Sequence, residues 1–164
     1  MMERISLHAL VDGMPVAWTA TVENHEGAWC LKIESSTAVE CEAVGPDLFE
    51  ALRQARGHLE PKGIRLCCNG ARIDTWPSRQ AREQGAWVVY THRLWLPPTV
   101  RDLVPVFGLA DAEKIGTVAE QEEFHARHLA NRKRWWFNFV NPLWWIYLFT
   151  SSWGRPKSFR PPSG

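Results

Sequence analysis

The chain has 164 residues, 19 Lys and Arg against 18 Asp and Glu, and a hydrophobic share of 45%. This length suits one globular domain with a core of ordinary size, and the composition excludes an intrinsically disordered chain. Tryptophan is the outlier, with 10 residues, and it is enriched at membrane–water interfaces and in binding hot spots.

The near-zero net charge hides a gradient along the chain. Residues 1–60 contain ten acidic and four basic residues, which gives −6, and residues 61–126 contain eight of each. Residues 127–164 contain seven basic residues and no acidic residue, which gives +7. A basic end beside an acidic body predicts an anionic partner for that end. Lipid headgroups, nucleic acid or an acidic protein surface would serve.

The N-terminal third alternates apolar and polar residues with a period of two. The runs cover residues 5–11, 16–22, 29–33 and 39–43, and Asp12-Gly13 between the first two is a strong turn dipeptide. Such a pattern predicts an antiparallel β-meander with one buried face.

A helix is predicted next, opened by Gly45-Pro46-Asp47 and stopped by Glu60-Pro61-Lys62-Gly63. Proline suits its first turn, and Asp47 is favourable near the positive end of the helix dipole. One face carries the apolar residues Leu48, Phe49, Leu52, Ala55 and Leu59. We expect this amphipathic helix to lie across the apolar face of the meander.

The second half predicts a smaller group of strands. Residues 64–68 form a short strand, Asn69-Gly70 a two-residue hairpin turn, residues 71–76 the return strand, and residues 86–95 a further strand. Thr99 and Asp102 resemble a capping box, and Thr117 with Glu120 forms a full one. A C-terminal helix then runs toward Trp135. The predicted fold class is α+β, with residues 1–131 as a single globular domain.

Residues 69–78 read Asn-Gly-Ala-Arg-Ile-Asp-Thr-Trp-Pro-Ser. This stretch resembles the Gly-Ala-Arg-x-Asp-x-aromatic-Pro-Ser string of an uncharacterised family of small bacterial proteins. The resemblance covers about residues 47–125 and implies a fold unit without implying any chemistry. Arg79 stands where that family has glycine.

Residues 135–154 carry no charged side chain and hold half of the tryptophans, and basic residues flank them on both sides. As a helix this stretch would approach the thickness of a bilayer core, but Asn141-Pro142 divides it. A bent aromatic segment in the headgroup region fits better than a clean span. The alternative is a segment folded onto the domain. We therefore treat residues 132–164 as a basic anchor and tail. The predicted membrane- or partner-binding residues are Arg132, Lys133, Arg134, Trp135, Trp136, Trp144, Trp145, Tyr147 and Trp153.

A second group of charged and aromatic side chains follows the expected hairpin turn. It comprises Arg72, Asp74, Trp76, Arg79 and Arg82. The plain interpretation is an ion pair of Asp74 with Arg72 or Arg79 that pins the turn, and the functional one is a surface for a partner. An enzyme would instead use Asp74 and His92 as an acid/base pair.

The remaining candidate residues are histidines and cysteines. His125 and His128 lie three apart on the expected helix, with Glu122 one turn earlier, a spacing that can place metal ligands on one face. No third strong ligand follows a recognisable spacing, so we expect neither a metal nor another cofactor. Cys67 and Cys68 are expected to be buried thiols.

The cysteines and the N-terminus indicate the compartment. The four cysteines contain no C-x-x-C spacing, although their even number would also permit two disulfides. The first residues lack the basic start and apolar run of a secretory signal. We expect reduced thiols and a cytoplasmic protein, peripheral or anchored at the inner face of the membrane.

Together these features predict a small non-catalytic bacterial binding protein of the immunity or adaptor type. It would have a protein partner and would associate with the membrane interface through its Trp-rich segment. One alternative is a soluble enzyme with a site around Asp74 and His92. The other is a single-stranded nucleic-acid binder that uses residues 132–136. The acidic body, which would repel a polyanion, disfavours this last alternative.

Overall fold

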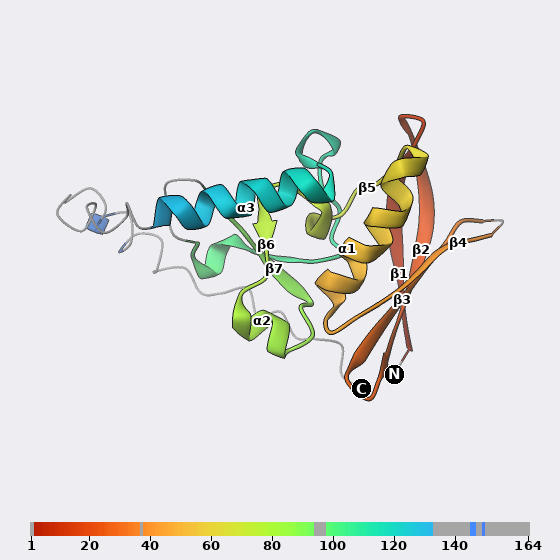
Figure 1. The fold of residues 1–164 in the computed structure, drawn as a ribbon, viewed down its shortest axis with the longest axis horizontal. Helices are drawn as coiled ribbons and strands as arrows, with labels where there is room; N and C mark the ends of the chain where they lie inside the picture. Colours follow the sequence, from red (N-terminus) through yellow and green to blue (C-terminus); the bar gives the residue numbers. More distant parts are fainter. Residues whose placement is uncertain (1, 37, 94–97, 133–144, 147–148, 150–164) are drawn as a thin grey trace.

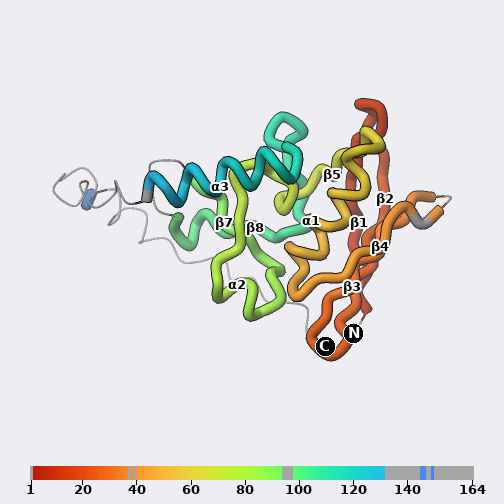
Figure 2. The backbone as a smooth tube through the Cα atoms, in the orientation of Figure 1, coloured from red at the N-terminus to blue at the C-terminus, as the bar shows by residue number. Residues whose placement is uncertain are grey.

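A computed structural model describes residues 2–36, 38–93, 98–132, 145, 146 and 149 of the chain (Figure 1). Within these residues, two antiparallel sheets and the helices α1, α2 and α3 make up an α+β fold, as predicted. The five-stranded sheet lies on one side of helix α1, and the three-stranded sheet and helix α3 lie on the other (Figures 1 and 2).

The larger sheet has the strand order β4-β3-β2-β1-β5. Its strands are β1 (Met2–Val11), β2 (Met14–His25), β3 (Ala28–Glu34), β4 (Val39–Gly45) and β5 (Ile64–Leu66). The first four form the predicted meander, in which each strand pairs antiparallel with the next. β5 joins the free edge of β1.

Two-residue turns set the register of the first three strands. Asp12 and Gly13 both adopt positive φ angles, 50° and 79°, and Glu26 and Gly27 repeat this at 51° and 90°. Two consecutive left-handed residues match the twist of the flanking strands, so these turns keep the strands in register. The turn predicted at Asp12-Gly13 is confirmed.

Helix α1 (Leu48–Leu59) covers the inner face of this sheet. Its five predicted apolar residues all have 0% exposure. Asp47 is the N-cap and accepts a 2.8 Å hydrogen bond from the backbone N–H of Glu50. Pro46 therefore precedes the cap and does not belong to the first turn of the helix.

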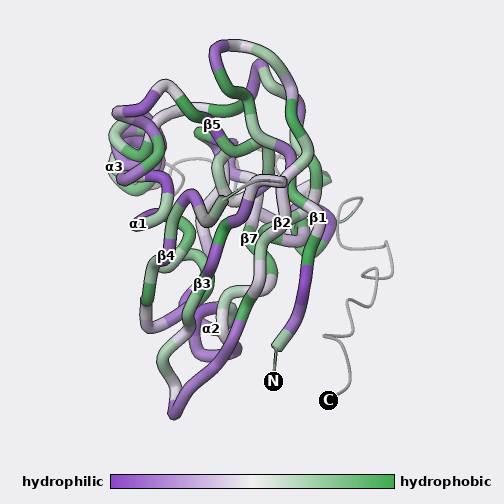
Figure 3. Tube along the Cα trace, turned by 90° about the vertical axis from the view of Figure 1, so that its right-hand side faces the viewer, coloured by the Kyte–Doolittle hydropathy of each residue, from purple (hydrophilic) through white to green (hydrophobic). Residues whose placement is uncertain are grey.

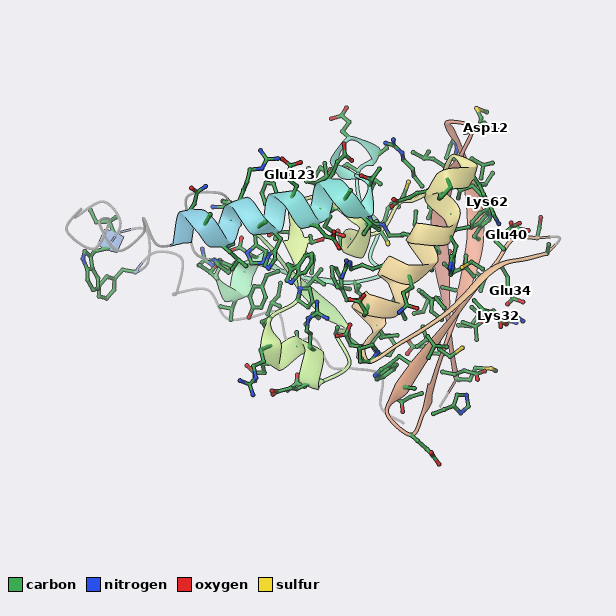
Figure 4. The ribbon with its side chains drawn as sticks, viewed as in Figure 1. Asp12, Lys32, Glu34, Glu40, Lys62 and Glu123 are labelled. Atoms are coloured by element: carbon green, nitrogen blue, oxygen red, sulfur yellow. The ribbon has the colours of Figure 1, made fainter. Side chains whose placement is uncertain are left out.

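The opposite face of the sheet is polar. Lys32 and Glu34 form a 3.0 Å ion pair there and point away from α1 (Figure 4). Hydrophilic and hydrophobic positions are interspersed along the strands (Figure 3), because side chains of a strand alternate between the helix-covered face and the polar face.

The hairpin predicted at Asn69-Gly70 is wrong. Residues Asn69–Ala71 form a short 3₁₀ turn, η2, after β5, and β5 pairs with β1. Gly70 is buried in the core, where an added Cβ would lie 2.5 Å from Leu52 and 2.6 Å from Val106. A hairpin turn needs an exposed tip, whereas this glycine lets the backbone pass close to α1.

The second sheet has the order β6-β7-β8. Its strands are β6 (Thr75–Trp76), β7 (Val88–Thr91) and β8 (Leu103–Pro105), with helix α2 (Arg79–Glu83) between β6 and β7. The other short elements are η1 (Glu60–Lys62), η3 (Val100–Asp102) and η4 (Ala112–Lys114). The predicted return strand is thus reduced to β6. Of the strand expected at 86–95, residues 88–91 form β7, and residues 94 and 95 lie outside the described residues.

Helix α3 (Val118–Arg132) begins at the predicted capping box. Glu120 accepts a 2.7 Å hydrogen bond from the N–H of Thr117, whose hydroxyl accepts one from the N–H of Glu120. The carboxylate of Glu60 accepts a further bond from the N–H of Val118. The capping box at Thr99 and Asp102 is also present, at η3.

A buried polar network joins α1, α3 and η2. The guanidinium of Arg56, 2% exposed, donates to Gln121 Oε1 at 2.6 Å and to the carbonyl of Gly116 at 2.7 Å. Gln121 Nε2 in turn donates to the carbonyls of Gly70, Arg72 and Thr75. Because buried polar groups need partners, this network fixes α3 relative to the core.

Candidate functional site

The candidate site lies where α1, β6, α2 and α3 meet. We call two parts of it by name. The Trp76 cluster consists of Phe49, Arg53, Trp76 and Arg82, and the histidine cluster consists of His92, His125 and His128. These side chains come from segments far apart in the sequence, and ring contacts join the two clusters.

Trp76 is half-buried at the centre of the site. The ring of His125 lies parallel to it, with centroids 4.0 Å apart and 6° between the planes. Phe49 meets it edge to face at 5.3 Å, and the guanidinium carbons of Arg53 and Arg82 lie 5.4 and 5.9 Å from its centroid. Stacking and cation–π contacts of this kind hold an indole in one orientation.

Both arginines of the Trp76 cluster also have carboxylate partners. Arg82 Nη1 lies 2.7 Å from Asp47 Oδ2, so the residue that caps α1 also binds α2. Arg53 pairs with Glu50 at 2.9 Å and with Glu122 on α3. Through these ion pairs, Arg82 links α2 to the start of α1, and Arg53 links α1 to α3.

A hydrogen-bonded chain connects the imidazoles to the backbone. His128, 3% exposed, has its Nδ1 3.0 Å from the carbonyl oxygen of Arg93 and its Nε2 3.1 Å from His92 Nδ1. A carbonyl oxygen can only accept, so His128 Nδ1 carries a proton. In the neutral ring, His128 Nε2 is then the acceptor and His92 Nδ1 the donor.

Burial makes protonation of this site unfavourable. Burial is the largest cause that lowers the pKa of His92 to about 4, and neighbouring His128 lowers it further. The Trp76 backbone, Asp74 and Asp102 raise this pKa but do not offset the burial. Burial, followed by the other two histidines and Arg82, also lowers the pKa of His125 to about 4. Both rings are neutral at pH 7.

Two buried nitrogens of the site, Arg53 Nε and His125 Nδ1, have no hydrogen-bond partner within the described part of the chain. His125 Nδ1 is buried, and no hydrogen-bonding group there lies within reach. A neutral imidazole nitrogen can accept a proton or bind a transition metal. However, no group of three or more His, Cys, Asp or Glu among the described residues is placed to hold a metal ion.

The structure brings together two of the five residues predicted as a second partner site. Trp76 and Arg82 belong to the Trp76 cluster. Arg72 forms a two-pronged ion pair with Asp74, at 2.8 and 2.6 Å, which confirms the predicted pinning pair. Arg79 is exposed and pairs with Glu83.

The side chains of Asp74 and His92, considered as an acid/base pair for an enzyme, each bind another residue. The Asp74 carboxylate binds Arg72, and the His92 ring binds His128. The hydrogen bond that joins the two residues runs from the backbone N–H of His92 to the carbonyl oxygen of Asp74, at 2.6 Å. This bond belongs to the pairing of β6 with β7 and orients neither side chain for proton transfer.

The sequence points to His125 and His128 as candidates, but it does not connect them with His92 and Trp76. Nor does it single out Arg53 as a member of the site. Arg53 follows Phe49 by one helical turn, so a shared helix face was the available signal. The contact across to β6 depends on how α1 packs, which the local pattern does not contain.

The cysteines lie apart from this site and are free. Cys41, Cys67 and Cys68 are buried, as predicted for the adjacent pair. Burial raises the pKa of Cys68 to about 11 and also raises the pKa of Cys67. These thiols therefore stay protonated and unreactive at neutral pH.

The predicted C-terminal anchor is described at few positions. Arg132 ends α3, and Trp145, Ile146 and Phe149 are exposed by 45%, 59% and 67%. The other predicted anchor residues, Lys133, Arg134, Trp135, Trp136, Trp144, Tyr147 and Trp153, lie outside the described residues. Within the described part of the chain, none of the helices has the length and apolar character needed to traverse a bilayer.

In comparisons with known proteins, no protein-family model matches the chain, and no curated protein sequence matches it.

Proposed function

We propose that this chain is a small non-catalytic bacterial binding protein that associates with an anionic membrane surface through its Trp-rich segment, residues 135–154. One observation supports the proposal most directly. Trp145, Ile146 and Phe149 expose about half or more of their surface, within a stretch that has no charged residue and basic residues on both flanks. Exposed apolar side chains grouped in this way are typical of interaction sites.

Simple energetics favour an interfacial location. Burial of each large apolar side chain contributes about 1.5–3 kcal/mol, and each cation near an anionic surface about 1 kcal/mol. Six basic residues flank the segment: Arg132, Lys133, Arg134, Arg155, Lys157 and Arg160. Tryptophan prefers the headgroup region to the hydrocarbon core, so a peripheral position at the inner face of the membrane suits this composition.

The body of the protein would then present a protein partner with its five-stranded sheet. Residues 1–60 carry the acidic excess, and Glu42 lies exposed on the polar face of the sheet, in register with Lys32. A basic partner surface would complement such a face. An immunity or adaptor role, in which the sheet masks or tethers a basic protein at the membrane, suits this arrangement.

The membrane association can be tested by co-sedimentation of the full chain with vesicles. We expect binding to vesicles that contain phosphatidylglycerol, and weaker binding to pure phosphatidylcholine or at high salt, because screening reduces the attraction of the flanking cations. A triple variant with W145S, I146S and F149S should lose most of this binding. The matched control is L109S, which alters another strongly exposed apolar residue, 70% exposed, outside the segment.

Two outcomes would overturn the proposal. The full chain could remain in the supernatant with anionic vesicles at low salt, or L109S could lose as much binding as the triple variant. Binding to single-stranded DNA with a steep salt dependence, in the absence of vesicle binding, would favour the nucleic-acid alternative.

A further inference from the structure

Helix α3 is held to the body in two different ways along its length. Its first two turns rely on the capping box at Thr117, the Glu60 carboxylate and the fully buried amide of Gln121. None of these contacts needs an imidazole. They keep the beginning of α3 fixed to η2 and the second sheet at any pH at which the carboxylates are ionised.

The C-terminal half of α3 depends on the histidine cluster. His125 stacks on Trp76, and His128 is buried against His92 and the carbonyl of Arg93. Other residues of this half face solvent, including Ala126, Arg127, Leu129 and Ala130. Among the described residues, these two imidazoles thus supply ring and hydrogen-bond contacts that hold the last turns to the body.

We propose that the histidine cluster is an acid-sensitive contact, and that its protonation releases the C-terminal half of α3 while the first half stays docked. The physical reason is crowding of positive charge. His92 Nδ1 and His128 Nε2 lie 3.1 Å apart and share one proton, so the two rings cannot both be cations in this geometry. His125 is 5.9 Å from His92 between ring centroids.

The charged groups around the histidine cluster determine how readily its imidazoles are protonated. Asp74, beside β6, and Asp102, at the end of η3, lie near His92 and favour its cationic form. Arg82 on α2 and the other two histidines oppose a charge on His125. Arg93 contributes its carbonyl to His128, and its side chain lies 3.6 Å from Asp102, which weakens that carboxylate's effect on His92.

The lowered pKa values of His92 and His125 determine how docking of the C-terminal half of α3 depends on pH. Released imidazoles regain an ordinary pKa near 6.5, whereas His92 and His125 have a pKa of about 4 in the docked helix. The released state therefore binds protons more tightly, and docking weakens as the pH falls from about 6.5 toward 4. The inference concerns the body alone and does not depend on membrane association.

Hydrogen exchange of the full chain, corrected for the intrinsic effect of pH, tests this inference. We expect protection of residues 124–132 to fall about tenfold or more between pH 7 and pH 5, while residues 118–122 and β2 keep theirs. The variants H92Q and H125Q should show a smaller pH effect. The matched control H25Q, at an exposed histidine, should behave like the unmodified chain.

Several results would overturn it. Protection of residues 124–132 could be equal at both pH values, or it could fall equally across the whole domain, which would indicate global unfolding. The glutamine variants could also retain the complete pH effect. Should these variants not fold, NMR titration of the unmodified chain decides. Loss of amide protection of residues 124–132 that follows the titration of His92 and His125 supports the inference, and titration of both rings without that loss contradicts it.

Discussion

His125 lies flat on Trp76, with ring centroids 4.0 Å apart and an interplanar angle of 6°. The two residues are 49 positions apart in the sequence and belong to α3 and β6. The contact joins the helix that leads into the Trp-rich segment to the second sheet, and it places a titratable ring on the most central aromatic residue of the site.

The stability of the domain should depend on pH through the histidines. Because the folded-state pKa of His92 and of His125 is about 4, below the ordinary 6.5, their contribution to stability is present above pH 6.5 and is lost as the pH falls toward 4. We expect a lower urea midpoint at pH 5 than at pH 7. The variant H92Q should show a smaller difference, and an unchanged difference would contradict the role given to His92.

Replacement of Gln121 by leucine should destabilise the domain strongly. The change removes the 2.6 Å acceptor of Arg56 Nη1 and the amide donor that Gln121 shares among the carbonyls of Gly70, Arg72 and Thr75. The carbonyls of Gly70 and Arg72 keep weaker bonds from Arg56 and Thr75. We expect a loss of about 3 kcal/mol in the free energy of unfolding, measured by urea denaturation. The control is Glu123→Ala on the same helix, where the side chain is exposed, and its effect should stay below about 0.5 kcal/mol. Equal effects of the two variants would show that the network contributes little.

The tight packing at Gly70 predicts that even one methyl group is not tolerated. An added Cβ would lie 2.5 Å from Leu52 and 2.6 Å from Val106, so Gly70→Ala must displace the core or η2. We expect a loss of about 1–3 kcal/mol, measured by thermal or urea unfolding. Gly57→Ala on α1, where nothing lies within 4 Å of the added atom, should be neutral or stabilising, since alanine favours a helix. A harmless Gly70→Ala would show that η2 has room to move.

Thiol reactivity should separate the cysteines by burial. Cys30 is the most accessible of the four, and Cys68 is completely buried with a pKa raised to about 11. In the folded protein at pH 8, we expect a thiol reagent to modify Cys30 first, and Cys67 and Cys68 only after unfolding. Mass spectrometry of digested samples measures the order. Rapid modification of Cys68 in the native state would contradict the burial of β5 and η2.

Much of the larger sheet and its helix could be read from local patterns. The period-two runs and Asp12-Gly13 predict the meander, because strand alternation and turn geometry depend on neighbouring residues. The capping residues Asp47 and Thr117 likewise marked the starts of α1 and α3, since a cap acts within one helical turn. These signals act over a few residues, so the local amino-acid sequence is enough to predict the strands and the helix starts.

Other features depend on contacts between segments that are distant in the sequence. Asn69-Gly70 has the composition of a hairpin turn, yet η2 is buried, because the space beside Leu52 and Val106 admits only a glycine backbone. The partners of Trp76, namely Arg53, Arg82 and His125, come from three helices, and only the packing of those helices brings them within contact. A side chain's neighbours across the core depend on the whole fold, and residue spacing along the chain carries no information about them.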